Sequence, residues 1–316
     1  MEKQKMYKNR KISAFDVVAF IVFLALAFIF WSFMRAVSLV QPAEFDFEII
    51  QPVGAAPQER LPESTEEAED VLPEFKRQLE MTIASFVDKQ PNDFGVYVSH
   101  LETGVSAEHN GQYAMSMASL YKPFAVVEAL KMVDAGLLNL AQPLLEDGTT
   151  LSACLEKAIT VSDNPCGLAL LKAANLSSGF GLKKIQTLGY KHTDLRGYFP
   201  ETTPRDMAKL MENIYRGTGL SADGQQTILS SLLGQTVNDR LPAGLPADSQ
   251  VAHKTGDLNG YSHDAGLVLD SQAGDYIIVV MSGPDDSGRL LSQRYVDFAR
   301  LASVIHELML TYSARL

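Results

Sequence analysis

Ser119-Leu120-Tyr121-Lys122-Pro123-Phe124 is the stretch on which the fold prediction depends. It opens a run whose apolar residues recur at three- and four-residue spacing up to Gly136, a helix stop signal. Pro123 fits a helix only in the first turn, where its missing N–H has no intrahelical partner, so the helix begins near Ser119. Residues three apart share a helix face, which places the Lys122 amine beside the Ser119 hydroxyl. In isolation, the same pair would more simply be an N-cap and a surface lysine.

A second motif, Ser162-Asp163-Asn164-Pro165, joins two apolar helical stretches, 155–161 and 166–172. Serine and aspartate are favoured N-caps and proline suits the first helical position, so capping alone would explain these residue types. A turn between helices can also direct Ser162 and Asn164 into a cleft. The motif is therefore compatible with a capping role and with a catalytic one.

A third motif, Lys254-Thr255-Gly256, lies in an extended stretch that follows the Pro- and Gly-rich segment 241–246. An edge strand at this place would present a cation and a hydroxyl to a carboxylate, and the glycine would let a substrate approach the backbone. A purely structural hairpin has no need of the lysine.

The three motifs together predict an acyl-transfer site. A serine hydroxyl is a weak nucleophile until a neighbouring base takes its proton, and Lys122 can be that base once desolvation and a second cation lower its pKa. Lys254 is the candidate for the second cation. Each motif alone occurs by chance in proteins of this size, but their order and context favour the catalytic interpretation of Ser119.

With these motifs the chain resembles the penicillin-recognising serine enzymes, most closely the class A β-lactamase family. The likeness covers residues 75–316 and includes Ala158-Ile159-Thr160-Val161-Ser162-Asp163-Asn164 and Thr202-Thr203-Pro204-Arg205-Asp206-Met207. The resemblance implies an acyl-enzyme mechanism without a cofactor. Two cysteines and scattered histidines give no zinc pattern, and a structural role is the default for His253 and His263.

The resemblance also implies chemical roles. Ser119 would attack the lactam or peptide carbonyl, and Lys122 would accept or relay its proton. Ser162 would pass a proton to the leaving nitrogen. The backbone N–H groups of Ser119 and Asp257 would form the oxyanion hole, which is commonly the largest single contribution to acyl-transfer catalysis.

Substrate-binding roles follow from the same resemblance. Asn164 would hold the catalytic lysine and the amide arm of the substrate. Lys254 and Thr255 would bind the substrate carboxylate, and Gly256 would leave room for it beside the strand. The expected ligand is a β-lactam or a peptidoglycan-stem peptide, bound by a monomer.

One departure from the family affects deacylation. Class A β-lactamases carry a long loop before the Thr-Pro segment, with a glutamate and an asparagine that position the deacylating water. Here residues 194–201 run almost directly into Thr202-Thr203-Pro204, and no Glu-x-x-Leu-Asn sequence occurs, so this omega loop looks truncated. Glu201 is a candidate substitute base, although a glutamate beside a turn is usually solvated. We therefore expect acylation followed by slow deacylation.

Three functions remain open at this point. The first is a serine hydrolase of the class A type that acts on β-lactams and confers antibiotic resistance. The second is a D-alanyl-D-alanine peptidase, a penicillin-binding protein that acts on peptidoglycan. The third is an inert binding protein, which has no need of the full motif set. Serine-dependent glutaminases share the fold and a comparable Ser-x-x-Lys element, but a membrane anchor disfavours a cytosolic amidase.

The N-terminal region predicts such an anchor. Residues 1–13 form a basic segment, with five Lys/Arg against one Glu within residues 1–11, and residues 14–36 include eighteen uncharged residues from Val17 to Met34. Positive flanks stay in the cytoplasm, so the remainder would lie outside a bacterial cell membrane crossed by this single signal anchor. A cleaved signal peptide is the alternative, but the apolar run is long and no Ala-x-Ala site follows it.

Residues 37–73 predict an acidic, proline-rich, flexible stalk. Residues 41–74 hold ten acidic residues, five prolines and a single base, Arg60. Of the net charge of −11, residues 1–11 contribute +4 and residues 41–74 contribute −9, which leaves about −6 for residues 75–316. A nucleic-acid-binding domain should be basic, so nucleic acid is disfavoured as a partner.

Residues 74–316 predict one catalytic domain of the α/β (α+β) class, with an antiparallel sheet flanked by helices and an all-helical subdomain. Strand-like runs occur near both ends of this region and the middle is mostly helical, which places the site at the junction. The expected elements are a helix at 74–87, a hairpin of 95–100 with 105–108, strands at 251–254, 265–269 and 276–281, and a closing helix at 293–312.

Cys154 and Cys166, the two cysteines of the chain, flank the second motif. Outside the membrane a disulfide between them is permitted. Two buried free thiols are equally compatible with the sequence, because sequence does not fix their geometry.

Overall fold

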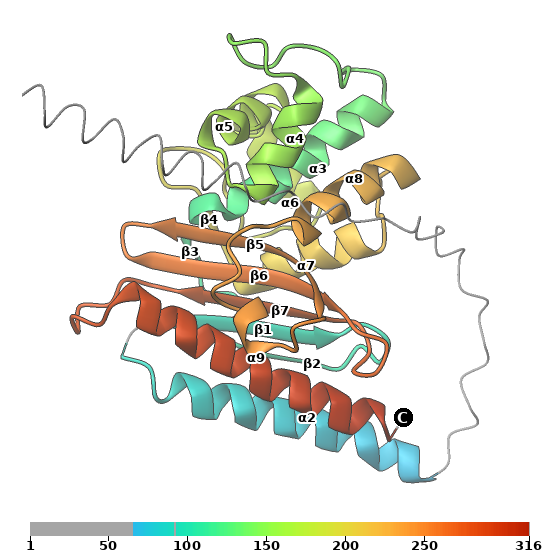
Figure 1. Cartoon of the computed structure of the whole chain (residues 1–316), viewed down its shortest axis with the longest axis vertical. Coiled ribbons are helices and arrows are strands. Elements are labelled where there is room, and N and C mark those ends of the chain that lie inside the picture. Colours follow the sequence, from blue (N-terminus) through green and yellow to red (C-terminus); the bar gives the residue numbers. More distant parts are fainter. Residues whose placement is uncertain (1–65, 92, 316) are drawn as a thin grey trace, which may run out of the picture. The chain divides into compact units, whose positions relative to one another are not determined.

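The computed structural model describes residues 66–91 and 93–315 (Figure 1). The predicted basic segment 1–13, the predicted transmembrane helix 14–36 and most of the predicted stalk lie outside these residues. Within them, no helix combines the length and apolar character needed to cross a bilayer.

The centre of the domain is a five-stranded sheet in the order β2-β1-β7-β6-β5. Every pair of neighbouring strands is antiparallel, which confirms the predicted fold class. Strand β5, which carries the third motif, is at one edge. The strands are β1 (Phe94–His100), β2 (Ser106–His109), β5 (Gln250–Leu258), β6 (Tyr261–Leu269) and β7 (Tyr276–Ser282).

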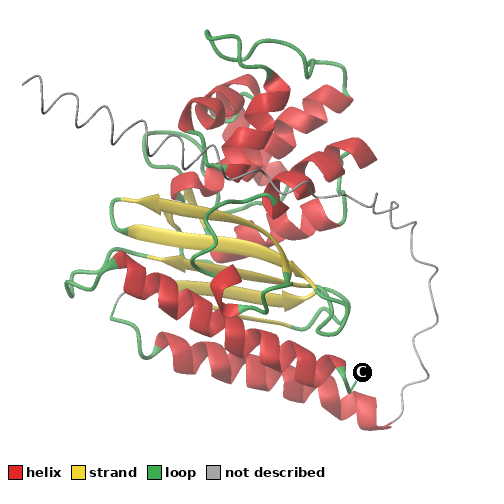
Figure 2. Ribbon diagram, viewed as in Figure 1, coloured by secondary structure: helices red, strands yellow, loops and turns green. Residues whose placement is uncertain are grey.

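Helices lie on both faces of this sheet, as Figure 2 shows. Helices α2 and α9 pack together on one face, and α7 lies on the other, next to the helical subdomain (Figure 1). The helices are α2 (Glu66–Val87), α3 (Tyr121–Asp134), α4 (Leu151–Thr160), α5 (Asn164–Ala173), α6 (Gly179–Thr187), α7 (Pro204–Tyr215), α8 (Ala222–Leu233) and α9 (Leu291–Ser313).

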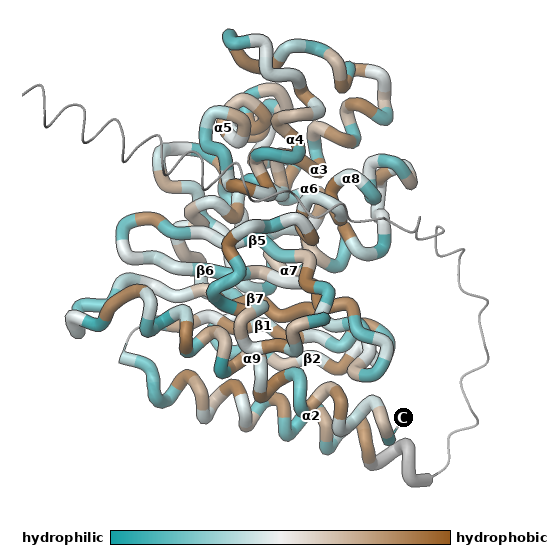
Figure 3. The backbone as a smooth tube through the Cα atoms, in the orientation of Figure 1, coloured by the Kyte–Doolittle hydropathy of each residue, from teal (hydrophilic) through white to brown (hydrophobic). Residues whose placement is uncertain are grey.

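The sheet separates two hydrophobic cores. Side chains along the central strand β7 alternate between the two faces of the sheet, which explains both cores. Ile278 and Val280 face the α2–α9 side, and Val279 faces the helical subdomain. The tube in Figure 3 is accordingly brown along much of the central strands. Phe75 and Phe298 belong to the first core and Phe124 to the second.

Helix α2 begins at Glu66, earlier than the predicted start at Glu74. The assignment of residues 66–73 to a flexible stalk is therefore wrong. Val71 is buried at 4% exposure and extends the apolar face of the helix by one turn. This packing offsets the cost of a proline in a helix interior, about 3 kcal/mol, and Pro73 itself is exposed.

The remaining elements occur where the sequence predicts them, with longer strands. Strand β5 continues past Lys254 to Leu258, and β6 starts at Tyr261 rather than Ala265. The prediction ended too early because glycine and aspartate disfavour strands, whereas the pairing of β5 with β6 continues through Gly256 and Asp257.

Candidate active site

Ser119 lies in a short 3₁₀ turn, Ala118–Leu120, that leads directly into α3. It is not the N-cap of α3, since the capping position is Leu120. Ala118 has a left-handed backbone conformation, with φ of 48°, which is rare for a residue other than glycine. The preceding residue is held from outside the turn, because the backbone N–H of Met117 donates to the carbonyl of Pro200 at 2.8 Å. The turn thus presents a partly exposed serine hydroxyl.

Lys122 is fully buried in the first turn of α3, and oxygen atoms surround its amine. Its Nζ lies 3.1 Å from Ser119 Oγ, 2.9 Å from Ser162 Oγ and 2.8 Å from Asn164 Oδ1. It also donates to the backbone carbonyl of Ser162. The structure therefore brings the first two motifs together around one amine.

Burial lowers the pKa of Lys122 from 10.5 to about 8, although the Asp163 carboxylate opposes the shift. The sequence predicted that desolvation and the Lys254 cation would lower it together. Burial is the main cause at Lys122, and the repulsion between the two cations contributes to the lowered pKa of Lys254. A fraction of the Lys122 amine is consequently neutral near pH 8 and able to take a proton.

Ser162 occupies a strained turn between α4 and α5, with a left-handed φ of 57°. The next residue, Asp163, caps α5 by accepting a hydrogen bond from the backbone N–H of Cys166 at 2.8 Å. The capping and the site-forming interpretations of the second motif therefore hold together. The Ser162 hydroxyl contacts the amines of both Lys122 and Lys254.

A disulfide joins Cys154 in α4 to Cys166 in α5, a pairing that the sequence left open. Both side chains are buried. The bond ties together the two helices on either side of the Ser162 turn, so it constrains the segment that carries the Ser162 hydroxyl.

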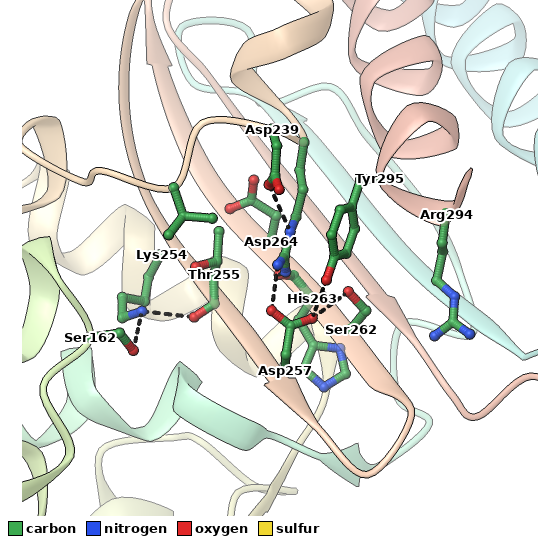
Figure 4. Close-up of polar contacts among 12 residues, drawn as sticks. Ser162, Asp239, Lys254, Thr255, Asp257, Ser262, His263, Asp264, Arg294 and Tyr295 are labelled. Carbon is green, nitrogen blue, oxygen red and sulfur yellow. Dashed lines mark hydrogen bonds and ion pairs between the residues drawn. The ribbon is translucent and has the colours of Figure 1, made fainter. Parts of the chain in front are cut away.

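Lys254 is fully buried on the edge strand β5. Its Nζ donates to Ser162 Oγ at 3.0 Å and to the carbonyl of Thr255 at 2.8 Å, as Figure 4 shows. Burial, with a smaller contribution from the Lys122 cation, lowers the pKa of Lys254 from 10.5 to about 7. All three motifs meet at the Ser162 hydroxyl.

The backbone of β5 passes close to the serine turn at Gly256. A Cβ at this position would lie 3.1 Å from the Ser119 nitrogen and 3.2 Å from the Met117 carbonyl oxygen, so a side chain would crowd the turn. The two N–H groups assigned to the oxyanion hole, those of Ser119 and Asp257, therefore belong to two segments in close contact.

Glu201 lies in β4 (Glu201–Thr202), which pairs with β3 (Met115–Ser116). Its backbone also exchanges two hydrogen bonds with Asp194, which closes the short loop 194–201. The Glu201 residue is exposed, and its carboxylate has no hydrogen-bond partner among the described residues. Among the described residues, no hydrogen bond joins its side chain to Ser119 or Lys122.

Two residues that touch the site were missed by the sequence analysis. Arg240, at 2% exposure, donates to the carbonyl of His263 at 2.8 Å and pairs with the carboxylate of Asp257. Gly167 in α5 packs directly on Lys122, since a Cβ there would lie 2.7 Å from Lys122 Cε. A loop arginine carries no distinguishing pattern, whereas a glycine inside a helix is a weak signal of close packing.

The two histidines beside the third motif have internal partners. His263 Nε2 donates to the carbonyl of Ser116 at 2.7 Å, and burial lowers its pKa to about 4, so it is neutral and ties β6 to the segment before Ser119. His253 Nδ1 lies 2.9 Å from the buried Asp264 carboxylate. Among the residues that the structure describes, no cluster of three or more His, Cys, Asp or Glu could hold a metal ion.

Comparison with known proteins places this chain and its fold in a known group. Residues 78–307 match the beta-lactamase enzyme family. The chain is 24% identical over 226 residues to a beta-lactamase of Streptomyces lavendulae, which covers 60% of this chain and 74% of that one. It is also 24% identical over 218 residues to the carbapenem-hydrolyzing beta-lactamase KPC of Klebsiella oxytoca. This match covers 60% of this chain and 71% of that one.

Solved structures show the same similarity. An ancestral (GNCA) class A beta-lactamase, of the last common ancestor of Gram-negative bacteria, superimposes with a TM-score of 0.65 at 25% identity, covering 73% of this chain and 99% of that one. A beta-lactamase from Chitinophaga pinensis superimposes with a TM-score of 0.67 over 73% and 98% of the two chains. At 23% identity, the latter supports the fold alone.

Proposed function

The chain belongs to the beta-lactamase enzyme family and has the class A fold, and from this premise we propose that it forms an acyl-enzyme through Ser119 with β-lactams or related amides. The observation that carries the proposal is the hydrogen-bond network from Ser119 through Lys122 and Ser162 to Lys254. An inert binding protein has no use for two fully buried lysines, because burying cations costs folding free energy.

In the proposed acylation, neutral Lys122 takes the proton of the Ser119 hydroxyl as Oγ attacks the amide carbonyl. The tetrahedral oxyanion is stabilised by the backbone N–H groups of Ser119 and Asp257. When the C–N bond breaks, the proton passes from Lys122 through the Ser162 hydroxyl to the leaving nitrogen. The 3.1 Å and 2.9 Å contacts of Lys122 Nζ with the two hydroxyls support this route.

Substrate binding follows from the same residues. Lys254 and Thr255 would attract the carboxylate of the substrate along β5, whereas the space that a side chain at Gly256 would fill is taken up by the serine turn. Asn164 already holds Lys122 through its Oδ1, and its amide N–H would donate to the arm of the substrate.

We propose that deacylation is slow. Deacylation needs a base that holds a water near the acyl carbonyl, and such assistance contributes about 10²–10⁴-fold. Among the described residues, no carboxylate is hydrogen-bonded to Ser119 or Lys122, and no hydrogen bond joins the Glu201 side chain to the network. Glu201 stays a candidate substitute base only if turnover proves fast.

A D-alanyl-D-alanine peptidase is the second candidate. The lack, among the described residues, of a carboxylate hydrogen-bonded to Ser119 or Lys122 favours it, because a penicillin-binding protein needs acylation by β-lactams but no rapid hydrolysis of the adduct. Its peptide substrate would use the same nucleophile, Ser119, and the same base, Lys122.

We also propose a location for the domain. Residues 14–36 would anchor it to a bacterial cell membrane, with residues 1–13 in the cytoplasm and the catalytic domain outside, as a monomer on an acidic stalk. Protease added to intact cells should then release a soluble, active fragment. Protection of the domain until lysis would show the opposite orientation.

The deciding experiment mixes the purified protein with a fluorescent penicillin and a chromogenic cephalosporin. Wild type should label covalently and release a burst of product equal to the enzyme concentration, followed by slow turnover, with the adduct visible by intact mass. Ser119→Ala should not label. Labelling of that variant at the wild-type rate would refute the nucleophile assignment, and fast hydrolysis without a burst would refute slow deacylation and call for Glu201→Gln.

A further inference from the structure

The carboxylate of Asp257 is held from three sides at the end of the third motif. Arg240 Nη2 pairs with its Oδ2, and the hydroxyls of Ser262 and Tyr295 donate to its Oδ1 at 2.8 Å and 3.2 Å. Figure 4 shows the carboxylate between Ser262 and Tyr295, beyond Lys254 and Thr255. Donors from three different elements thus fix both carboxylate oxygens.

The cation of Arg240 is committed to this arrangement. Its guanidinium is 2% exposed, lies 4.1 Å from the centre of the Tyr295 ring, and contacts the exposed Asp239 carboxylate only at 3.3 Å. The other buried arginine nearby, Arg294, instead donates to the carbonyl of Gly260 at 2.6 Å. Asp257 is therefore the main ion-pair partner of Arg240.

The position of Asp257 brings its charge next to the proposed carboxylate subsite. Asp257 and Thr255 are two residues apart on β5, so their side chains project from the same face of the strand. Strand β5 is an edge strand, and the Asp257 side chain retains 38% exposure. A substrate carboxylate bound by Lys254 and Thr255 would also meet this negative charge, and Arg240, already paired with Asp257, would not be free to bind it.

We propose that Asp257 is a specificity-determining residue that weakens the attraction of Lys254 and Thr255 for a free carboxylate beside the scissile amide, and so narrows the preference for such substrates over those in which that group is neutral. This inference rests on the proposed acylation of Ser119. The Asp257 carboxylate repels a second carboxylate and occupies the Arg240 cation that could otherwise bind it, and like-charge contacts are a common means of rejecting a ligand.

The test compares two chromogenic cephalosporins that differ only in whether the carboxylate beside the lactam nitrogen is free or esterified. The measured quantity is the ratio of the acylation rate constants, acid over ester. Asp257→Asn keeps a side-chain oxygen for Ser262 and Tyr295 but removes the charge, and it should raise the ratio by about tenfold or more. The rise should come from the acid probe and should weaken at high salt.

Asp239→Asn is the matched control, because it removes a charge that also contacts Arg240 but is 54% exposed. It should change the ratio by less than about twofold. An unchanged or lowered ratio in Asp257→Asn, or an equal rise in both variants, would overturn the proposal. If Asp257→Asn folds poorly, Tyr295→Phe is the second variant, because it removes one hydrogen bond to the Asp257 carboxylate. This variant should lower the ratio of acid to ester acylation. An unchanged ratio would count equally against the proposal.

The outcomes separate this inference from the proposed function. If neither probe acylates wild type, the proposed function fails first. If both acylate Ser119 but the ratio does not respond to Asp257→Asn, acyl-enzyme formation stands and the specificity role of Asp257 is wrong.

Discussion

The two sides of the sheet are built on opposite principles. On the α2–α9 side, Phe75 is fully buried and stacks on Tyr312 with ring centres 4.7 Å apart, within an apolar core. On the side of the helical subdomain, two lysine side chains are buried at 0% exposure, Lys122 in helix α3 and Lys254 on the edge strand β5. Apolar burial stabilises the fold, whereas buried cations cost stability.

The difference teaches where stability and chemistry are located. The lowered pKa values of the two lysines measure how unfavourable their charged forms are in the folded state. A neutral amine beside Ser119 exists near pH 8 only because that cost is borne by the rest of the fold. Mutations on the two sides should therefore separate into losses of stability and losses of acylation.

The largest expected effect is on the chemistry. Lys122→Met keeps the length of the side chain but removes the base, so the acylation rate should fall by about 10²–10⁴-fold. Thermal stability should be equal or higher, because a buried cation is replaced by an apolar group. Both are checked by labelling with a fluorescent penicillin and by a melting curve. A variant that acylates normally, or that loses much stability, would break the proposed division.

On the opposite side, Phe75→Ala should lower the free energy of unfolding by about 3–5 kcal/mol, since it leaves a cavity beside Tyr312. The acylation rate per folded molecule should not change. Met81→Ala is the matched control, because Met81 lies on the same helix at 54% exposure and should cost little. Denaturant unfolding and active-site titration measure the two quantities. A large loss of acylation in folded Phe75→Ala would show that the two sides are coupled.

A smaller effect tests how closely the site is packed. Gly167→Ala places a methyl group 2.7 Å from Lys122 Cε and 2.7 Å from the Tyr121 hydroxyl, so the lysine must shift. Displacement of a catalytic group by about 1 Å can cost about 10²-fold in rate. Gly179→Ala, where no atom lies within 4 Å of the added Cβ, is the control and should acylate normally. Equal rates in both variants would mean that Lys122 tolerates displacement.

Much of the fold was predictable because its signals are local. Apolar periodicity predicted α3 and α9, and the Ser162 turn between two helices followed from residue types. The start of α2 was missed because the burial of Val71 depends on tertiary packing, which outweighed the proline-rich composition.

The site was predictable only as a set of short motifs. Residue spacing placed Lys122 beside Ser119, but no local pattern could show that Arg240 folds back from a loop onto Asp257 at the strand edge. Desolvation was predicted as a cause of the lowered pKa of Lys122, but its extent was beyond the sequence, because burial at a particular atom is a property of the packed structure.

The smallest expected effect is on pH dependence, and it joins the two sides. With the esterified cephalosporin, the acylation rate should rise about tenfold per pH unit below pH 8 and level off above it, because the neutral form of Lys122 is the base. The free energy of unfolding should also rise with pH between about 7 and 10.5. In this window the unfolded lysines, with pKa values of 10.5, bind more protons than the folded ones, whose pKa values are about 8 and about 7. Phe75→Ala should keep the same pH midpoint of the acylation rate. Its free energy of unfolding should be lower than that of the wild type at every pH. A rate midpoint near 10 in the wild type would show that burial does not lower the pKa of Lys122, and the contrast between the two sides would then fail at its central residue.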